Sequence, residues 1–191
     1  MAFRPDATTR SVTGISTGKL AIWWLIGSEI VIFGGLLASY VMHRLGHEEW
    51  GGYAAHTNVI AGGTNTFVLL TSSLFAVLAH QAAESGDGKK AAKFLWYTVG
   101  GALLFLVIKS VEWTMEINAG YTITANSFWS FYYTATGIHA SHVIAGAIAM
   151  IVIAKDAAQG KELQRVENVG IYWHFVDIVW IFLFPLLYIA K

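Results

Sequence analysis

Five long apolar segments, each about the length of a membrane span, constrain this chain more than any other feature. We place them at residues 20–43, 64–84, 92–114, 127–154 and 168–190. A helix needs about 20 residues to cross roughly 30 Å of hydrocarbon. Because backbone polar groups in lipid must bond within their own segment, helix is the expected structure. The sequence therefore predicts an all-α membrane protein, with five transmembrane helices in a single membrane domain spanning residues 1–191.

The composition agrees with a chain that lies mostly in lipid. Of 191 residues, 55% are hydrophobic and 13% are charged, whereas soluble domains carry about 25% charged residues. The absence of cysteine excludes disulfides, thiolate metal sites and cysteine nucleophiles. A formal net charge of zero gives no support for a nucleic-acid partner. Residues 1–18 are polar, so we expect a cytoplasmic tail rather than a cleavable signal peptide.

The distribution of lysine and arginine predicts the orientation in the membrane. One side receives the N-terminal tail and the connections after the second and fourth segments. The basic residues expected on this side are Arg4, Arg10, Lys19, Lys89, Lys90, Lys93, Lys155, Lys161 and Arg165. The opposite side receives Arg44 and Lys191. Because cytoplasmic flanks carry the excess of positive charge, we predict a cytoplasmic N-terminus and a C-terminus outside.

Ionisable residues within the apolar segments are the functional leads, because lipid makes each of them costly. Counted along their helices, Glu29, His142 and Asp177 fall roughly 13–18 Å from the cytoplasmic face at about 1.5 Å per residue. We predict that they share one layer of the bundle. Lys109 and Glu112 are three positions apart, on one helix face, and are predicted to form an internal ion pair.

Two further pairs repeat the three-residue spacing, His139 with His142 and His174 with Asp177. Four interpretations of these polar groups stay open: haem ligation by histidines, an ion or proton pathway through a carrier, structural bonds between helices, and a docking and lipid-holding role in a larger enzyme. Few deep histidines disfavour haem ligation. The absence of paired short, Gly/Pro-interrupted segments disfavours a carrier. The residue pattern alone does not separate the last two interpretations.

A stripe of small residues follows one face of the fourth segment. Gly137, Ser141, Ala145 and Ala149 recur at every fourth position. Because small side chains let membrane helices approach closely, we predict tight packing of another helix against this stripe.

Five stretches, taken in order, resemble subunit III of the haem-copper respiratory oxidases. They are the Ser-Glu helix Trp24–Phe33, Asn65–Ser73, the region of Glu112 (where the family has Gln-x-x-Glu), Thr136–Val143 with the pattern Thr-Gly-x-His-x-x-His-Val, and Glu167 followed by Tyr172–Trp180. The last two motifs are highly specific, whereas the Ser-Glu match alone would be weak. Together they touch all five segments.

The resemblance implies a subunit without redox centres in an oxidoreductase that reduces oxygen to water and pumps protons. Such a chain carries no catalytic residue, haem, copper or other metal, and the haem and copper lie in partner subunits. It packs mainly beside subunit I, in a complex that also contains subunit II. It holds phospholipids in a cleft between its helix groups and supports proton uptake and sustained turnover.

The resemblance also assigns roles to individual residues. Glu29 is the buried carboxyl group that reacts with carbodiimide; apolar surroundings favour the uncharged form of a carboxyl group, which is the form a hydrophobic carbodiimide attacks. The internal structural polar groups are Lys109, Glu112, His139, His142, Glu167, His174 and Asp177. Lys155, Trp24 and Trp173 are hypothesised to bind lipid.

Two features depart from the family pattern. Lys109 stands where the family usually has glutamine. Five helices replace the seven of the mitochondrial form, which favours a bacterial plasma membrane. Two related alternatives are an accessory subunit of a quinol oxidase or of a nitric oxide reductase with the same fold. Two unrelated ones are a stand-alone transporter and a haem-binding cytochrome b. This chain does not decide the electron donor.

Overall fold

The long helices follow the apolar segments in the computed structural model, which describes residues 17–47 and 49–190. They are α1 (Thr17–Leu45), α3 (Val59–Glu84), α4 (Gly88–Asn118), α5 (Ser127–Ala158) and α6 (Gln164–Phe184). Within the described residues, five helices are long and apolar enough to cross a membrane. The prediction of an all-α protein with five such helices is confirmed. The helices extend beyond the predicted segments at one or both ends, as where α3 begins at Val59 and α5 continues to Ala158.

Two short elements were not predicted. The helix α2 (Trp50–Ala54) lies in the connection between α1 and α3, and the π-helix η1 (Pro185–Ile189) continues α6. Proline has no backbone N–H and its ring crowds the carbonyl group four residues earlier. The backbone widens after Pro185, and the N–H of Ala190 donates to the Pro185 carbonyl oxygen five residues back, at 2.8 Å.

Short connections with defined caps make successive long helices antiparallel. The side chains of Asn58, Asp87 and Asn126 each accept a hydrogen bond from the backbone N–H three residues later, which satisfies a free donor of the first turn. The turns after α3 and α5 use Gly86 at φ +79° and Gly160 at φ +70°, a conformation in which a side chain would be strained.

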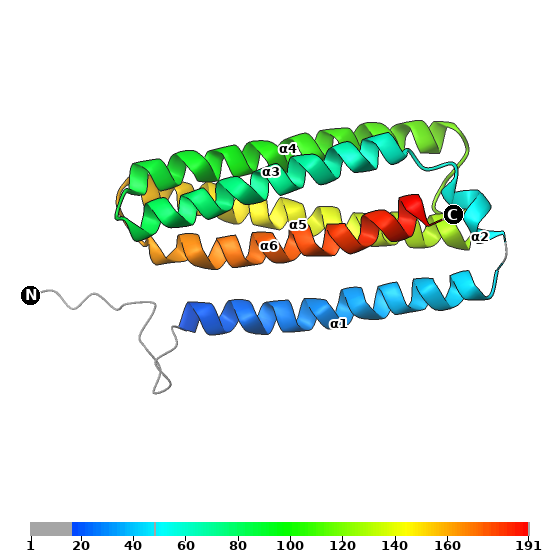
Figure 1. The fold of residues 1–191 in the computed structure, drawn as a ribbon, viewed down its shortest axis with the longest axis horizontal. Coiled ribbons are helices and arrows are strands. Elements are labelled where there is room, and N and C mark those ends of the chain that lie inside the picture. The colour runs from blue at the N-terminus through cyan, green and yellow to red at the C-terminus, as the bar shows by residue number, and fades with distance from the viewer. Residues whose placement is uncertain (1–16, 48, 191) are drawn as a thin grey trace, which may run out of the picture.

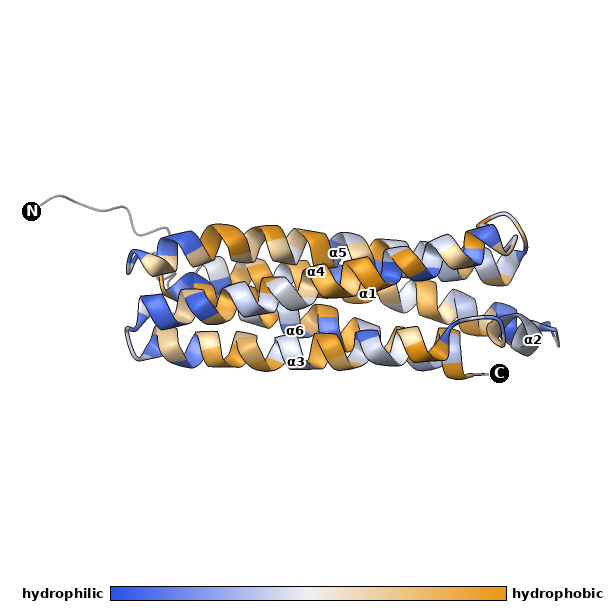
Figure 2. Ribbon diagram, turned by 90° about the horizontal axis from the view of Figure 1, so that it is seen from above, coloured by the Kyte–Doolittle hydropathy of each residue, from blue (hydrophilic) through white to orange (hydrophobic). Residues whose placement is uncertain are grey.

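The arrangement is a group of four helices with a fifth along its side (Figure 1). Helices α3, α4, α5 and α6 pack together, and α1 lies beside α6 and α5. The start of α1 and the α3–α4 and α5–α6 turns gather at one end, here called the lysine-rich end. The α2 helix, the α4–α5 connection and the C-terminus gather at the opposite end. Hydrophobic residues dominate the middle and hydrophilic residues increase toward both ends (Figure 2).

Glycines and serines let the four-helix group pack closely. A Cβ atom on Gly101 of α4 would lie 2.6 Å from the Cβ of Ser72 on α3, and one on Gly146 of α5 would lie 3.0 Å from the Trp173 ring. Trp173 is fully buried, and its Nε1 donates to Ser72 Oγ at 3.1 Å. At these points a side chain of one helix lies directly against the backbone of its neighbour, as small residues permit in membranes.

Candidate functional site

Helix α1 is held to the rest of the molecule much more loosely. In its most apolar stretch 17% of the residues are buried, against 50% in α6. Its buried residues are Ile26, Phe33 and Tyr40, one every seven positions. That spacing produces a single narrow seam along the helix. Most of the α1 surface is left for lipid or for another protein.

Three polar contacts reinforce the seam at its start, middle and end. They are Lys19 Nζ with Glu167 Oε1 at 2.5 Å, Glu29 Oε2 with His142 Nε2 at 3.0 Å, and the Tyr40 hydroxyl donating to the Leu186 carbonyl oxygen at 2.7 Å. The third contact reaches into the π-helix, where the regular helical bonds of α6 have ended. Each contact joins α1 to α5, α6 or η1, so polar groups supplement a thin apolar seam.

The middle contact joins two titratable groups at membrane depth. His142 Nδ1 lies 2.8 Å from the Ile138 carbonyl oxygen; since a carbonyl oxygen only accepts, Nδ1 carries a hydrogen. Nε2 then faces Glu29 Oε2 at 3.0 Å, although the two groups are not aligned as a regular hydrogen bond. Two lone pairs at this distance would repel each other. The arrangement is suited to hold one proton, on Glu29 or on His142, with no net charge.

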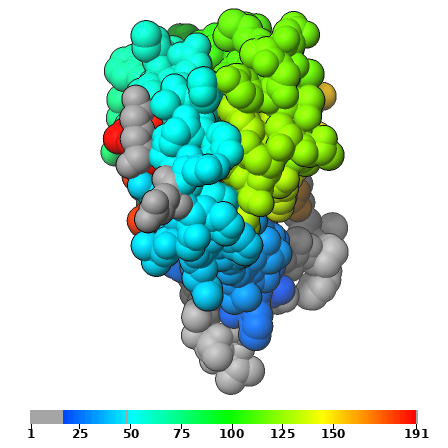
Figure 3. All heavy atoms as spheres, turned by 90° about the vertical axis from the view of Figure 1, so that its right-hand side faces the viewer, coloured from blue at the N-terminus to red at the C-terminus, as the bar shows by residue number. Residues whose placement is uncertain are grey.

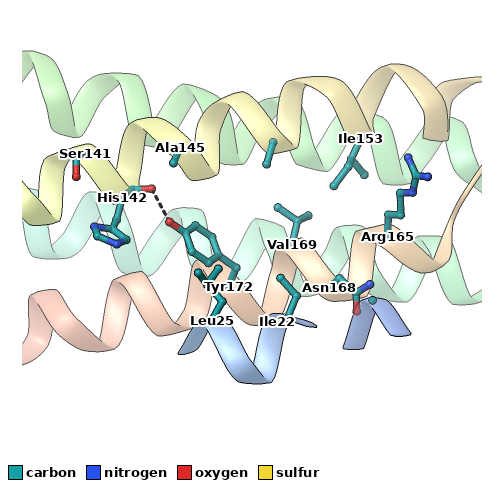
Figure 4. Close-up of a pocket in the computed structure, with 12 residues that line it drawn as sticks. Ile22, Leu25, Ser141, His142, Ala145, Ile153, Arg165, Asn168, Val169 and Tyr172 are labelled. Carbon is teal, nitrogen blue, oxygen red and sulfur yellow. Dashed lines mark hydrogen bonds between the residues drawn. The ribbon is translucent and has the colours of Figure 1, made fainter. Parts of the chain in front are cut away.

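A cleft of about 600 Å³ lies between α1, α5 and α6, beside this pair. Its walls are largely apolar, from Ile22, Leu25, Ile153 and Val169, and His142 lies at one end of it (Figure 4). The Tyr172 hydroxyl donates to the His142 carbonyl oxygen at 3.2 Å across the wall.

The other end of the cleft is polar. Arg165 and Asn168 line it near the α5–α6 turn, at the lysine-rich end (Figure 4). Arg165 also contacts Asp156 Oδ2 at 3.7 Å and Glu162 Oε2 at 3.3 Å. The cleft therefore combines a long apolar wall with a cation at one mouth.

The small-residue stripe of α5 faces this cleft, which corrects our prediction. Ser141, Ala145 and Ala149 line the cleft and do not receive a tightly packed helix. The close approach of α5 to α6 occurs instead at Gly146, against the Trp173 ring. Small residues at the three lining positions therefore leave space between α1 and the bundle.

A second polar cluster is sealed inside the four-helix group; we call it the Lys109 cluster. Lys109 Nζ donates to Glu112 Oε2 at 3.1 Å, to the Tyr132 hydroxyl at 2.8 Å and to the Tyr188 hydroxyl. The Tyr132 hydroxyl oxygen lies 2.9 Å from Glu112 Oε1 and 2.9 Å from Glu116 Oε1. The cluster joins α4, α5 and η1 through one ammonium group.

The Lys109 cluster has no net charge when one of its two carboxyl groups is protonated. One ammonium group and two carboxyl groups lie together, and Lys109 and Glu112 are 2% and 1% exposed. Removing charges from water is costly unless they are paired and hydrogen-bonded. Tyr132 has one hydroxyl hydrogen, so it donates to one carboxyl group at a time. The arrangement can hold one proton on Glu112 or Glu116, which leaves the cluster neutral.

Comparison with known proteins identifies the family. Residues 3–191 match the family described as "Cytochrome c oxidase subunit III". The chain belongs to the cytochrome c oxidase subunit III family. Cytochrome c oxidase subunit 3 of Corynebacterium diphtheriae is 34% identical over 184 residues, covering 93% of this chain and 88% of that protein. The same-named protein of Thermostichus vulcanus is 31% identical over 167 residues, covering 85% and 82%.

A further relative has a composite name. The "Heme-copper oxidase subunit I+III" of Aeropyrum pernix is 33% identical over 184 residues, covering 90% of this chain and 22% of that protein. This chain is accordingly a subunit III of a haem-copper oxidase, and it forms part of an oxidoreductase complex.

The polar residues predicted for the site lie at several separate positions in this subunit III chain. Glu29 and His142 are in contact, whereas Asp177 follows His174 by one turn, and His174 Nδ1 is 2.6 Å from Ser73 Oγ on α3. The contacts of His139 with Trp180 and of Gly146 with Trp173 place Asp177 at the depth of His142, as predicted, although Asp177 forms no contact with the Glu29–His142 pair. Asp177 is 4% exposed, and neither carboxyl oxygen has a hydrogen-bond partner among the described residues.

His139 and His142 point to different neighbours despite their spacing. His139 is fully buried, and its ring packs against Phe105 and Trp180 with centroids 5.5 and 5.1 Å apart. His142 instead faces α1, where its ring meets Phe33 at 5.3 Å. The described residues contain no group of three or more His, Cys, Asp or Glu side chains placed to hold a metal ion.

Two expectations about subunit III side chains need correction. Glu167 is not internal: it is partly exposed at the lysine-rich end, where it contacts Lys19. Trp173 is buried between helices and is not available to lipid. Trp24, which is 75% exposed, and Lys155, which is also exposed, do not line the cleft, and lipid binding by these two side chains stays a prediction.

Sequence reasoning missed three members of the Lys109 cluster and the cation of the cleft. Glu116 follows Glu112 by four positions and so shares its helix face, a signal that was present in the sequence. Tyr132 and Tyr188 gave no such signal, because they reach Lys109 from 23 and 79 residues away. Arg165 was counted as an orientation signal and not as a lining residue.

Proposed function

We propose that this subunit holds a membrane phospholipid in the cleft between α1 and the α5–α6 pair and stabilises subunit I of the oxidase. The cleft itself carries the proposal. Its apolar walls lie within membrane-spanning helices, where an acyl chain is the natural occupant. Arg165 stands at the mouth, near the expected depth of lipid headgroups, and a guanidinium group suits a phosphate.

Filling the cleft tests this assignment. Ala145→Leu places a larger side chain on the lining face of α5. We expect native mass spectrometry of the purified complex to show loss of a bound phospholipid, and Arg165→Gln to weaken its retention. Ala38→Leu is the matched control, because Ala38 is exposed on α1 and does not line the cleft. Full lipid retention in Ala145→Leu would exclude this site.

Subunit I is the proposed main partner, with subunit II in the same complex and haem and copper in those partners. The Aeropyrum pernix relative is named as subunit I+III, which supports a close association of the two subunits here. Purification in mild detergent through a tag on this chain should recover haem-bearing large subunits. Recovery of this chain without them, under conditions that preserve the oxidase activity of the membranes, would contradict the proposal.

The proposed location is a bacterial plasma membrane with the lysine-rich end in the cytoplasm. At that end the described residues include Lys19, Lys89, Lys90, Lys155 and Lys161, as the positive-inside rule requires. Because the chain has no cysteine, single substitutions report topology. Ala125→Cys in the α4–α5 connection should react with an impermeant thiol reagent on intact cells, and Ser85→Cys in the α3–α4 turn should react after lysis. The reverse result would invert the orientation.

Glu29 is proposed to support proton uptake by the complex as the buried, carbodiimide-reactive carboxyl group. Its contact with His142 supports this role, because the pair can hold one proton beside the cleft at membrane depth. We expect Glu29→Gln to shorten the period of sustained turnover while the initial rate of oxygen reduction stays near normal. Unchanged turnover in that variant would leave Glu29 a purely structural contact.

A further inference from the structure

Two exposed histidines four positions apart lie at the end of α1: His43 in its last turn and His47 just after the helix ends at Leu45. They lie at the opposite end of the bundle from the lysine-rich end. The last turn of α1 and the α2 segment cover this end beside the α4–α5 connection (Figure 3). Neither residue belongs to the cleft or to the Lys109 cluster. We propose that the two side chains form a binding site for a divalent transition-metal ion.

Both imidazole rings are held in the same tautomer. His43 Nδ1 lies 3.0 Å from the Ser39 carbonyl oxygen, and His47 Nδ1 lies 2.8 Å from the His43 carbonyl oxygen. A carbonyl oxygen only accepts, so each Nδ1 donates and each neutral ring keeps its lone pair on Nε2. Metal-binding histidines almost always donate their second ring nitrogen in this way, which orients the ring and strengthens the ligand.

The two rings are also placed side by side. Their planes differ by 5° and their centroids are 6.4 Å apart. Metal–nitrogen bonds of about 2.0–2.1 Å require the Nε2 atoms to come within about 4 Å of each other. Since both side chains are exposed, we expect rotations about χ1 and χ2 to bring the two Nε2 atoms to this separation when the ion binds. Phe131 and Trp50 pack against the rings at 5.1 and 6.0 Å and limit how far they rotate away.

The two imidazole ligands indicate which metal ions the site would bind. Helical zinc sites use two histidines four residues apart; His43 and His47 keep this spacing across the end of α1, and each ring bonds the carbonyl oxygen four residues earlier. Imidazole suits zinc, copper and nickel. Glu49 lines the same hollow of about 470 Å³ as His47 and adds a negative charge nearby. With two imidazole ligands and water in the remaining positions, the bound ion is exchangeable and is not a redox centre of the oxidase.

Equilibrium dialysis of the purified oxidase complex against Zn²⁺ tests the site. The bound zinc is compared between the unmodified complex and the variants His43→Gln, His47→Gln and His56→Gln. Because a chelate needs both ligands, each of the first two variants should lose one zinc ion, with affinity weakened by at least about tenfold. His56→Gln is the matched control, since His56 is exposed in the same connection but has no histidine one turn away.

A rescue variant separates a chelate from general surface binding. Ser39→His combined with His47→Gln restores a pair one turn apart, at residues 39 and 43, and should recover the lost zinc ion. Unchanged zinc binding in either single variant would overturn the proposal. So would a loss of only about half of the zinc bound by the pair, with the affinity of the remainder unchanged, as two independent ligands would give. A failed rescue in a complex of normal yield would overturn it as well.

Discussion

Helix α1 and the four-helix group α3–α6 are equally apolar but are held by different means. In the four-helix group, small residues such as Gly101 and Ser72 bring helix backbones together. On α1, a Cβ atom added to Gly27, Gly34 or Gly35 would have no neighbouring atom within 4 Å. Spaced polar contacts support α1 instead. The difference teaches that hydrophobicity places a helix in the membrane, whereas its attachment depends on local packing and on a few polar groups.

The largest loss of stability is expected when the ammonium group of Lys109 is removed from the four-helix group. Lys109→Met leaves Glu112 and Glu116 buried without their ammonium partner, which should cost about 3–5 kcal/mol of stability. Thermal denaturation of the detergent-solubilised complex measures the loss. Lys109→Gln should cost less, because a glutamine side chain still donates hydrogen bonds. Equal losses in both variants would mean that hydrogen bonds donated by residue 109 contribute nothing without its charge, and a loss below about 1 kcal/mol in Lys109→Met would contradict the role of the charge.

The next largest change in stability is expected from close packing in the same group, and substitutions of two adjacent glycines test it. Gly101→Ala forces a Cβ to within 2.6 Å of Ser72 Cβ and should destabilise by about 1–3 kcal/mol. Gly100→Ala meets no atom within 4 Å and should stabilise by up to about 1 kcal/mol, because alanine favours helix. The same denaturation measurement decides the sign. Similar shifts for both variants would refute the close contact of α3 and α4.

Chemical labelling contrasts carboxyl groups in the two regions. We expect a hydrophobic carbodiimide to modify Glu29 first, because it contacts His142 at the end of the cleft and its side chain is 12% exposed. Glu112 and Glu116, at 1% and 6% exposed, should remain unmodified in the folded complex. Peptide mapping by mass spectrometry identifies the labelled residue. Label confined to loop carboxylates such as Glu49 would remove the distinction between the two regions.

The smallest effect comes from a single contact of α1. Tyr40→Phe removes the hydrogen bond to the Leu186 carbonyl oxygen while keeping the buried ring. Hydrogen bonds between membrane helices average about 0.6 kcal/mol, so the loss should be of that order. Tyr53→Phe is the control, because its hydroxyl bonds to Glu49 outside the spans. A loss of several kcal/mol for Tyr40→Phe would show that α1 is anchored mainly at this point.

The sequence alone was sufficient for several features of the site. The three-residue spacing of Lys109 and Glu112 predicted a contact that depends on helical geometry alone. Glu29 and His142 were grouped by depth, and they meet. Trp173 was misplaced as a lipid contact, because hydropathy does not tell which face of a helix is buried. The stripe of Ser141, Ala145 and Ala149 was misread for the same reason, since small residues equally permit a close helix or an open cleft.

The sequence by itself determined the five spans, the family and the pairs of residues that lie within one helical turn. These depend on local quantities: transfer into lipid, backbone hydrogen bonding and the period of the helix. Only the tertiary structure decided that α1 stands beside a cleft, that Tyr132 and Tyr188 complete the Lys109 cluster, and that Asp177 is separate from Glu29. Such contacts depend on how helices are rotated against each other, and in lipid that rotation follows from packing and not from hydrophobicity.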